Sequence, residues 1–191
     1  EERCRNQGAV SGVPTGLDIL DRYTGGLRPG HLIIIGGRPS QGKTSLAVNI
    51  AKNAAAEGYP VGFFSQEMTK EEITEAAVCI EANVDTMALQ NGTLSQGDWE
   101  RINDCADHLS RLPLFTDDTG SLHINQLRAR ARRLVKKQKI KILFVDYLQL
   151  SRGEGDRKDL EIGNITAGLK ALAKELKIPI VVLSQLNRKL E

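Results

Sequence analysis

The stretch HLIIIGGRPSQGKT, residues 31–44, decides the fold of this chain. Its first part, His31–Gly36, is a short apolar run rich in isoleucine, typical of a buried strand. Its second part, Gly37–Thr44, matches the pattern G-x-x-x-x-G-K-[ST] at every position. An alanine-rich helical stretch, Lys43–Glu57, follows and stops next to Gly58. Strand, glycine-rich loop and helix in this order predict a phosphate-binding loop (P-loop) inside an α/β domain.

Similar apolar runs recur along the chain and alternate with helical patterns. Further strands are expected at Val61–Ser65, Ile142–Asp146 and Ile178–Ser184, with a weaker one at Pro113–Thr116. Helices are expected at Lys70–Ala82, Ser95–Leu109, Asn125–Lys139 and Leu160–Leu176. This alternation predicts a mostly parallel central sheet. Because the strands are apolar on both faces, we expect helices on both faces of that sheet.

Composition narrows the class of protein without naming a function. The 191 residues suffice for one α/β domain, and a formal net charge of +2 is too small to indicate a nucleic-acid partner. The three cysteines are far apart and form no C-x-x-C pair, so we expect reduced thiols of a cytosolic protein. The longest apolar run is far too short to span a bilayer, and no signal peptide begins the chain, so we expect no membrane contact.

The P-loop predicts the chemistry of its own residues. Backbone N–H groups in such a loop cradle phosphate, and the positive end of the following helix adds to the attraction. Lys43 is expected on the β- and γ-phosphates of ATP, and the Thr44 hydroxyl on Mg²⁺. The alternative is a glycine-rich turn with an incidental Gly-Lys-Thr. The predicted nucleotide-binding residues are Gly37, Arg38, Pro39, Ser40, Gln41, Gly42, Lys43, Thr44 and Ser45.

Polar residues at the ends of other strands complete the predicted site. Asp146 closes a fully apolar strand and is expected to hold Mg²⁺, through water, unless it only begins a turn. Because Tyr147 follows it, the base that positions the attacking water must come from another strand end, and Glu67 is the best candidate. Glu67 as a solvated loop residue is the alternative. Gln185 follows the last strand and is either a γ-phosphate sensor or an ordinary polar strand end.

Several ordered segments together resemble the C-terminal motor domain of bacterial DnaB-type replicative helicases. The resemblance runs from about Val13 to the end of the chain and also fits phage-encoded helicases. It rests on these segments: Val13–Asp18 (VPTGLD), Gly26–Gly30 (GLRPG), Arg38–Thr44 (RPSQGKT), Phe64–Met68 (FSQEM), Val145–Leu150 (VDYLQL), Leu169–Leu176 (LKALAKEL) and Leu183–Arg188 (LSQLNR).

The resemblance implies a RecA-like P-loop NTPase fold, a homo-hexameric ring, and ATP-driven 5′→3′ movement on single-stranded or forked DNA. It implies roles for Lys43, Thr44, Glu67, Asp146 and Gln185 in ATP hydrolysis, with Mg²⁺ as the metal. It also implies primase and helicase-loader partners and a cytoplasmic, nucleoid-associated location in a bacterial or phage-infected cell.

Residues 1–12 are then expected to be a linker or tail, and residues 13–191 a core that is truncated at its C-terminal end. Two other functions stay open at this point. One is a RecA-superfamily recombination or regulatory ATPase, and the other is a nucleotide-binding assembly module that is not catalytic alone.

Two basic segments are candidates for DNA contact. The charged stretch Ser151–Gly163 is expected to be a loop, in which Arg152, Arg157 and Lys158 would neutralise DNA phosphates. A solvated loop is the alternative, because three acidic residues offset these charges. The second segment carries eight cations and is expected to be a solvated or subunit-facing helix surface: Arg128, Arg130, Arg132, Arg133, Lys136, Lys137, Lys139 and Lys141.

Overall fold

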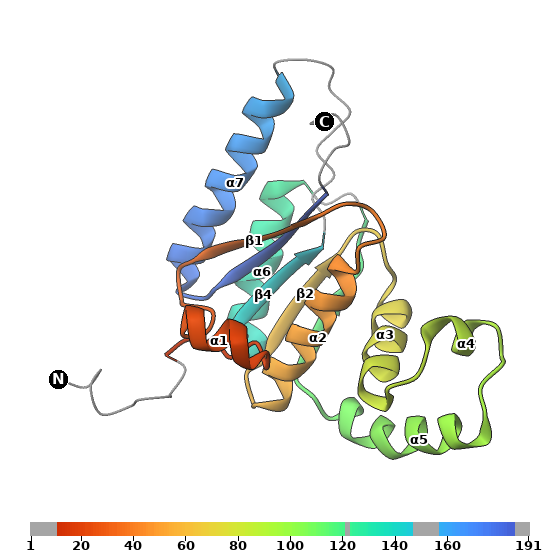
Figure 1. Ribbon diagram of the computed structural model, residues 1–191. Coiled ribbons are helices and arrows are strands. Elements are labelled where there is room, and N and C mark those ends of the chain that lie inside the picture. Colours follow the sequence, from red (N-terminus) through yellow and green to blue (C-terminus); the bar gives the residue numbers. More distant parts are fainter. Residues whose placement is uncertain (1–10, 121–122, 147–156, 186–191) are drawn as a thin grey trace.

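The computed structural model describes residues 11–120, 123–146 and 163–185, together with the helical backbone of residues 157–162. It contains one parallel sheet of five strands in the order β1-β5-β4-β2-β3. Helices lie on both faces of this sheet (Figure 1). The strands are β1 Leu32–Gly37, β2 Val61–Ser65, β3 Leu114–Asp117, β4 Ile142–Asp146 and β5 Ile180–Gln185. The predicted α/β fold with a parallel sheet between two helical layers is confirmed.

The helices fill the connections between successive strands. They are α1 Asp18–Thr24, α2 Lys43–Ala56, α3 Lys70–Ala82, α4 Thr86–Gln90, α5 Gln96–Ser110, α6 Ile124–Gln138 and α7 Arg157–Leu176. One apolar core joins α2 and α3 to the sheet, and a second joins α6 and α7 to its other face. Strands β2 and β4 lie in the middle and are buried along their whole length. The rings of Phe63 and Phe144 stack there with their centroids 5.6 Å apart.

Local signals explain where several helices begin. Thr69 and Glu72 form a capping box at the start of α3, and Ser95 and Asp98 form another at the start of α5. The short helices α1 and α4 were not predicted, because seven and five residues carry too little periodicity. The prediction of a loop over the whole of Ser151–Gly163 is wrong, since α7 begins at Arg157.

The segment before β1 is fastened to α2, the helix that follows the P-loop. The buried carboxylate of Asp21 accepts hydrogen bonds from the backbone N–H and hydroxyl of Thr15 and from the N–H of Gly16. Asn53 of α2 donates from Nδ2 to the carbonyl oxygen of Thr15. Gly16 has φ +71°, and a Cβ there would lie 2.3 Å from Asn53 Nδ2, so only glycine fits. This network holds α2 in place from the end opposite the P-loop.

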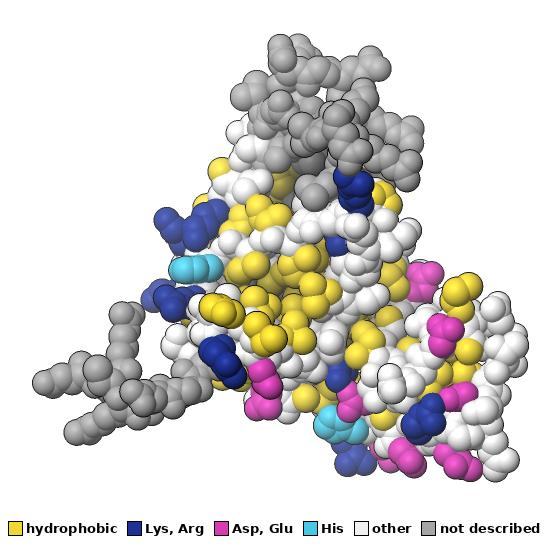
Figure 2. All heavy atoms as spheres, in the orientation of Figure 1, with side chains coloured by type: hydrophobic (Ala, Val, Ile, Leu, Met, Phe, Trp, Pro, Cys, Tyr) yellow, Lys and Arg dark blue, Asp and Glu magenta, His cyan; other side chains and the backbone are white. Residues whose placement is uncertain are grey.

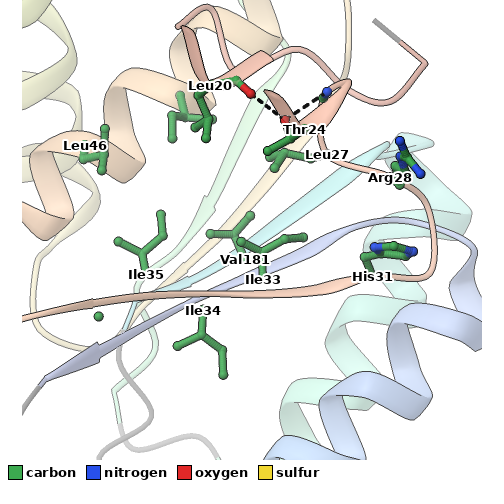
Figure 3. A pocket seen from close by; sticks show the side chains of 13 residues that line it. Leu20, Thr24, Leu27, Arg28, His31, Ile33, Ile34, Ile35, Leu46 and Val181 are labelled. Atoms are coloured by element: carbon green, nitrogen blue, oxygen red, sulfur yellow. Dashed lines mark hydrogen bonds between the residues drawn. The ribbon is translucent and has the colours of Figure 1, made fainter. Parts of the chain in front are cut away.

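Strand β1 lies at one edge of the sheet, and the expectation that it is covered on both faces is wrong. Ile34 is 56% exposed, whereas Ile33 and Ile35 point to the opposite side of the strand, toward α1 and α2 (Figure 3). A groove of about 570 Å³ runs between α1, β1 and α2, and apolar side chains gather over it in Figure 2. Within the described ranges, no helix is long and apolar enough to cross a membrane.

Candidate functional site

The carboxyl ends of four strands meet at one rim of the sheet. In the parallel ladders, Gly37 of β1 lies beside Gln185 of β5, and Asp146 of β4 lies beside Ser65 of β2. The P-loop leaves the sheet at this rim and leads into α2 (Figure 1). Open parallel sheets bind ligands at this end of their strands, because the connecting loops diverge there.

The P-loop takes the conformation that its glycines permit. Gly42 has φ +75° and forms the N-cap of α2, and a Cβ on it would have no atom within 4 Å. Ser40 also has a positive φ of 61°, which is uncommon for a residue other than glycine. The Gln41 side chain accepts a hydrogen bond of 2.8 Å from the Arg38 N–H and so holds the loop closed on itself. The first amides of α2 have no intrahelical acceptor and are therefore available to an anion.

Lys43 is held over the start of the loop. A Cβ on Gly37 would lie 2.9 Å from Cγ and 3.1 Å from Cδ of Lys43, so the lysine stem crosses Gly37 closely. Glycine at this position therefore makes room for the cation. The same Gly37 is the last residue of β1, which ties the lysine to the end of the sheet.

Asp146 is the buried carboxyl of the site, with 1% of its surface exposed. It accepts a hydrogen bond from the Thr44 hydroxyl, but among the described residues its Oδ2 has no hydrogen-bond partner. Burial raises the pKa of Asp146 above its usual value. The charge of Glu67 adds to this rise, while the Thr44 hydrogen bond and the charge of Lys43 oppose it. All four side chains are therefore close enough to influence one another.

Glu67 is exposed on the turn that follows β2. The buried hydroxyl of Ser65 accepts a hydrogen bond of 3.0 Å from the Met68 N–H, and the Gln66 N–H donates to the Asp146 carbonyl oxygen. These two bonds fix the backbone on both sides of Glu67 and direct the turn toward β4. Sequence reasoning missed the anchoring role of Ser65, and its only signal was a polar residue ending an apolar strand.

The residues present fit a magnesium ion. Mg²⁺ prefers oxygen ligands, keeps several of its waters, and is commonly bound through one or two carboxylates and substrate phosphates. Thr44 and Asp146 offer a hydroxyl and a buried carboxylate oxygen that lacks a partner among the described residues. In the same part of the chain there is no cluster of three or more His, Cys, Asp or Glu side chains that could bind a metal alone. A metal here would therefore share its ligands with phosphate and water.

The remaining predicted residues are placed as follows. Gln185 is the last residue of β5 and is exposed next to Gly37. Arg38, Pro39, Ser40, Gln41 and Ser45 are exposed along the P-loop and the first turn of α2. Arg152 lies outside the described residues, as do the side chains of Arg157 and Lys158, so the predicted DNA contacts stay predictions.

Comparisons with known families and curated proteins all lead to one group. The family model of the DnaB-like helicase C-terminal domain matches residues 12–191. The chain is 43% identical to the replicative DNA helicase DnaB of Nostoc sp. over 98% of its own length. It is 44% identical to DnaB of Rickettsia prowazekii, again over 98% of its length, and 37% identical to the replicative DNA helicase DnaC of Bacillus subtilis over all of it.

The chain covers only part of each of these relatives. It spans 22% of the Nostoc protein, 41% of the Rickettsia protein and 43% of the Bacillus protein. Among solved structures, an isolated ATPase domain superimposes with a TM-score of 0.87 at 28% identity, covering 98% of this chain and 68% of that one. A DnaB-like replicative helicase, studied with its interactions with primase, gives the same TM-score of 0.87 at 26% identity, covering 98% and 46%.

Proposed function

The chain belongs to the DnaB-like helicase C-terminal domain family, and from this premise we propose that it is the ATP-hydrolysing motor of a replicative DNA helicase. One observation carries the proposal: a lysine, a hydroxyl and two carboxylates converge at the rim where the P-loop leaves the sheet. Names of relatives alone would not assign an activity to a chain that spans less than half of them. The convergence supplies the chemistry that phosphoryl transfer needs.

In this proposal each side chain has a separate task. The P-loop amides hold the β- and γ-phosphates, and Lys43 neutralises the charge that develops on them during transfer. Thr44 and Asp146 hold Mg²⁺, with Asp146 acting through a water; the bound metal neutralises phosphate charge and bridges the phosphates. Glu67, exposed on the turn after β2, orients the attacking water by accepting its proton.

Gln185 is the proposed sensor of the γ-phosphate. It ends the strand that pairs with β1, beside Gly37, so an amide–phosphate hydrogen bond would link the nucleotide to β5. Loss of the γ-phosphate would then release the segment that follows residue 185. Coupling of this kind is how hydrolysis would drive movement along single-stranded DNA.

The whole-protein properties follow from the family and remain proposals. They are a homo-hexameric ring, 5′→3′ movement that unwinds forked DNA, contacts with primase and a helicase loader, and a place at the nucleoid in the cytoplasm. The named relatives are replicative helicases, which favours this function over a recombination or regulatory ATPase.

Two variants test the assignment. Glu67→Gln should keep Mg·ATP affinity while turnover falls by at least about a hundredfold, because only the base is lost. Lys43→Ala should weaken nucleotide binding itself, measured by calorimetry. Turnover unchanged by Glu67→Gln would move the base elsewhere. Wild type and Lys43→Ala hydrolysing ATP at the same rate would instead indicate an assembly module without catalysis.

A further inference from the structure

The basic run of α6 divides into two groups with different surroundings. Two of its arginines are used inside the domain: Arg130 Nη1 lies 2.7 Å from Asp117 Oδ2, and Arg132 binds Glu175 through two contacts of 2.7 and 2.9 Å. The lysines that follow behave differently. In the described ranges, Lys136, Lys139 and Lys141 make no ion pair with an acidic residue.

These three lysines surround a hollow of about 630 Å³ together with Lys177, which comes from the end of α7. The hollow lies where α6 and α7 end and β4 and β5 begin, so it is at the rim opposite the P-loop (Figure 1). No described acidic side chain lines it. The acid closest in sequence to Lys177 is Glu175, which is already paired with Arg132.

The floor of the hollow is apolar. It is formed by Val135, Ile140, Leu176 and Ile178, with Tyr59 at one side. Ile140 and Ile178 are buried and belong to the core shared by α6 and α7, so this floor is rigid. The four lysines are exposed and stand around it. A site with an apolar floor and a cationic border combines two requirements that a simple solvated surface does not have.

Helix ends explain part of the arrangement. Lys139 and Lys177 follow the last turns of α6 and α7 with φ of 56° and 55°, where a cation offsets the negative end of a helix. That reason does not extend to Lys141, which precedes β4 and belongs to no helix. It also does not explain why the lysines border a hollow that is lined by isoleucine, leucine and valine.

We propose that this lysine-bordered hollow docks an acidic peptide segment of another protein, with an apolar side chain on the floor and flanking carboxylates on the lysines. Charge complementarity sets the sign of the partner, and the floor sets its class. A nucleic-acid backbone would satisfy the lysines but would leave the apolar floor facing phosphate and sugar. Arginine, whose planar fork is preferred for phosphate, is absent from the described border.

The test uses a short fluorescein-labelled peptide of Asp and Glu with two central Leu residues, followed by fluorescence anisotropy at low salt. Lys136→Gln with Lys141→Gln removes two border charges, and neither residue has a positive φ. The matched control, Arg133→Gln with Lys137→Gln, removes the same charge from exposed positions of α6 outside the hollow. Circular dichroism and thermal unfolding check that both variants are folded.

We expect saturable binding that weakens with salt, a loss of affinity of about tenfold in the border variant, and no change in the control variant. The same peptide with Ser in place of Leu should bind more weakly, because it does not use the floor. The proposal is overturned by no binding of the Leu peptide, by equal affinity of the two variants, or by equal affinity of the Leu and Ser peptides. Oligodeoxythymidine that binds in place of the peptide and is lost in the border variant would assign the surface to nucleic acid instead.

Discussion

Asp146→Asn should change stability and ligand binding in opposite directions. In the nucleotide-free protein the wild-type carboxylate is buried, its Oδ2 has no described partner, and its pKa is raised chiefly by burial. A buried polar atom without a partner costs about 1–3 kcal/mol. Asparagine keeps the shape and removes the charge, so we expect the free energy of unfolding to rise by about 1 kcal/mol. For a chain of this length that raises Tm by about 2–4 °C.

Bound nucleotide reverses the advantage. A ligand at a hundred times its Kd stabilises a protein by about 2.7 kcal/mol, and a tenfold loss of affinity lowers this to about 1.4 kcal/mol. We expect Asp146→Asn to lose at least that much of the Mg·ATP stabilisation, because the metal loses its anionic ligand. Thermal unfolding with and without Mg·ATP measures both effects in one series. Asp104→Asn makes the same chemical change at an exposed site and is the control.

The effect of pH checks the cause. Because the folded-state pKa of Asp146 lies above its usual 3.8, the wild type loses stability as pH rises through the folded-state pKa, and the variant does not. The advantage of Asp146→Asn should therefore be full at neutral pH and disappear as pH falls towards 3.8. A variant that is less stable than wild type without nucleotide at neutral pH would refute this reasoning, as would equal Mg·ATP stabilisation of both proteins.

Three further outcomes are expected. Gly37→Ala brings a Cβ within 2.9 Å of the Lys43 stem and should weaken nucleotide affinity at least about tenfold in a fluorescent-nucleotide titration; unchanged affinity would show that the lysine has another path. Ser65→Ala removes the anchor of the β2 turn and should lower turnover more than nucleotide affinity, so an equal loss of both would contradict it. Burial raises the pKa of Asp117, but hydrogen bonds from Thr119 and Arg130 outweigh it and lower that pKa. The pair therefore stabilises the fold above pH 3.8 and loses this effect as pH falls below it, so Arg130→Gln should be less stable in urea at neutral pH and approach wild type in acid.

Much of the fold was predictable because its signals are local. The five strands and the five long helices follow from apolar runs, helical periodicity and capping residues such as Ser95. Their boundaries differ from the predicted ones by three residues or fewer. The exception is the charged stretch before Leu160, where the helical backbone already begins at Arg157. Acidic and basic residues at a helix end weaken the apolar pattern on which the prediction depended.

The sequence by itself determined which groups carry the chemistry, because the P-loop motif and the polar strand ends are properties of the chain. Only the tertiary structure decided that Asp146 pairs with Ser65 in register, that Lys43 crosses Gly37, and that one carboxylate oxygen is buried without a described partner. It also decided that the cations of α6 divide between internal ion pairs and a lysine-bordered hollow. The physical reason is that strand order and side-chain direction arise from contacts between segments far apart in sequence, and no local pattern records them.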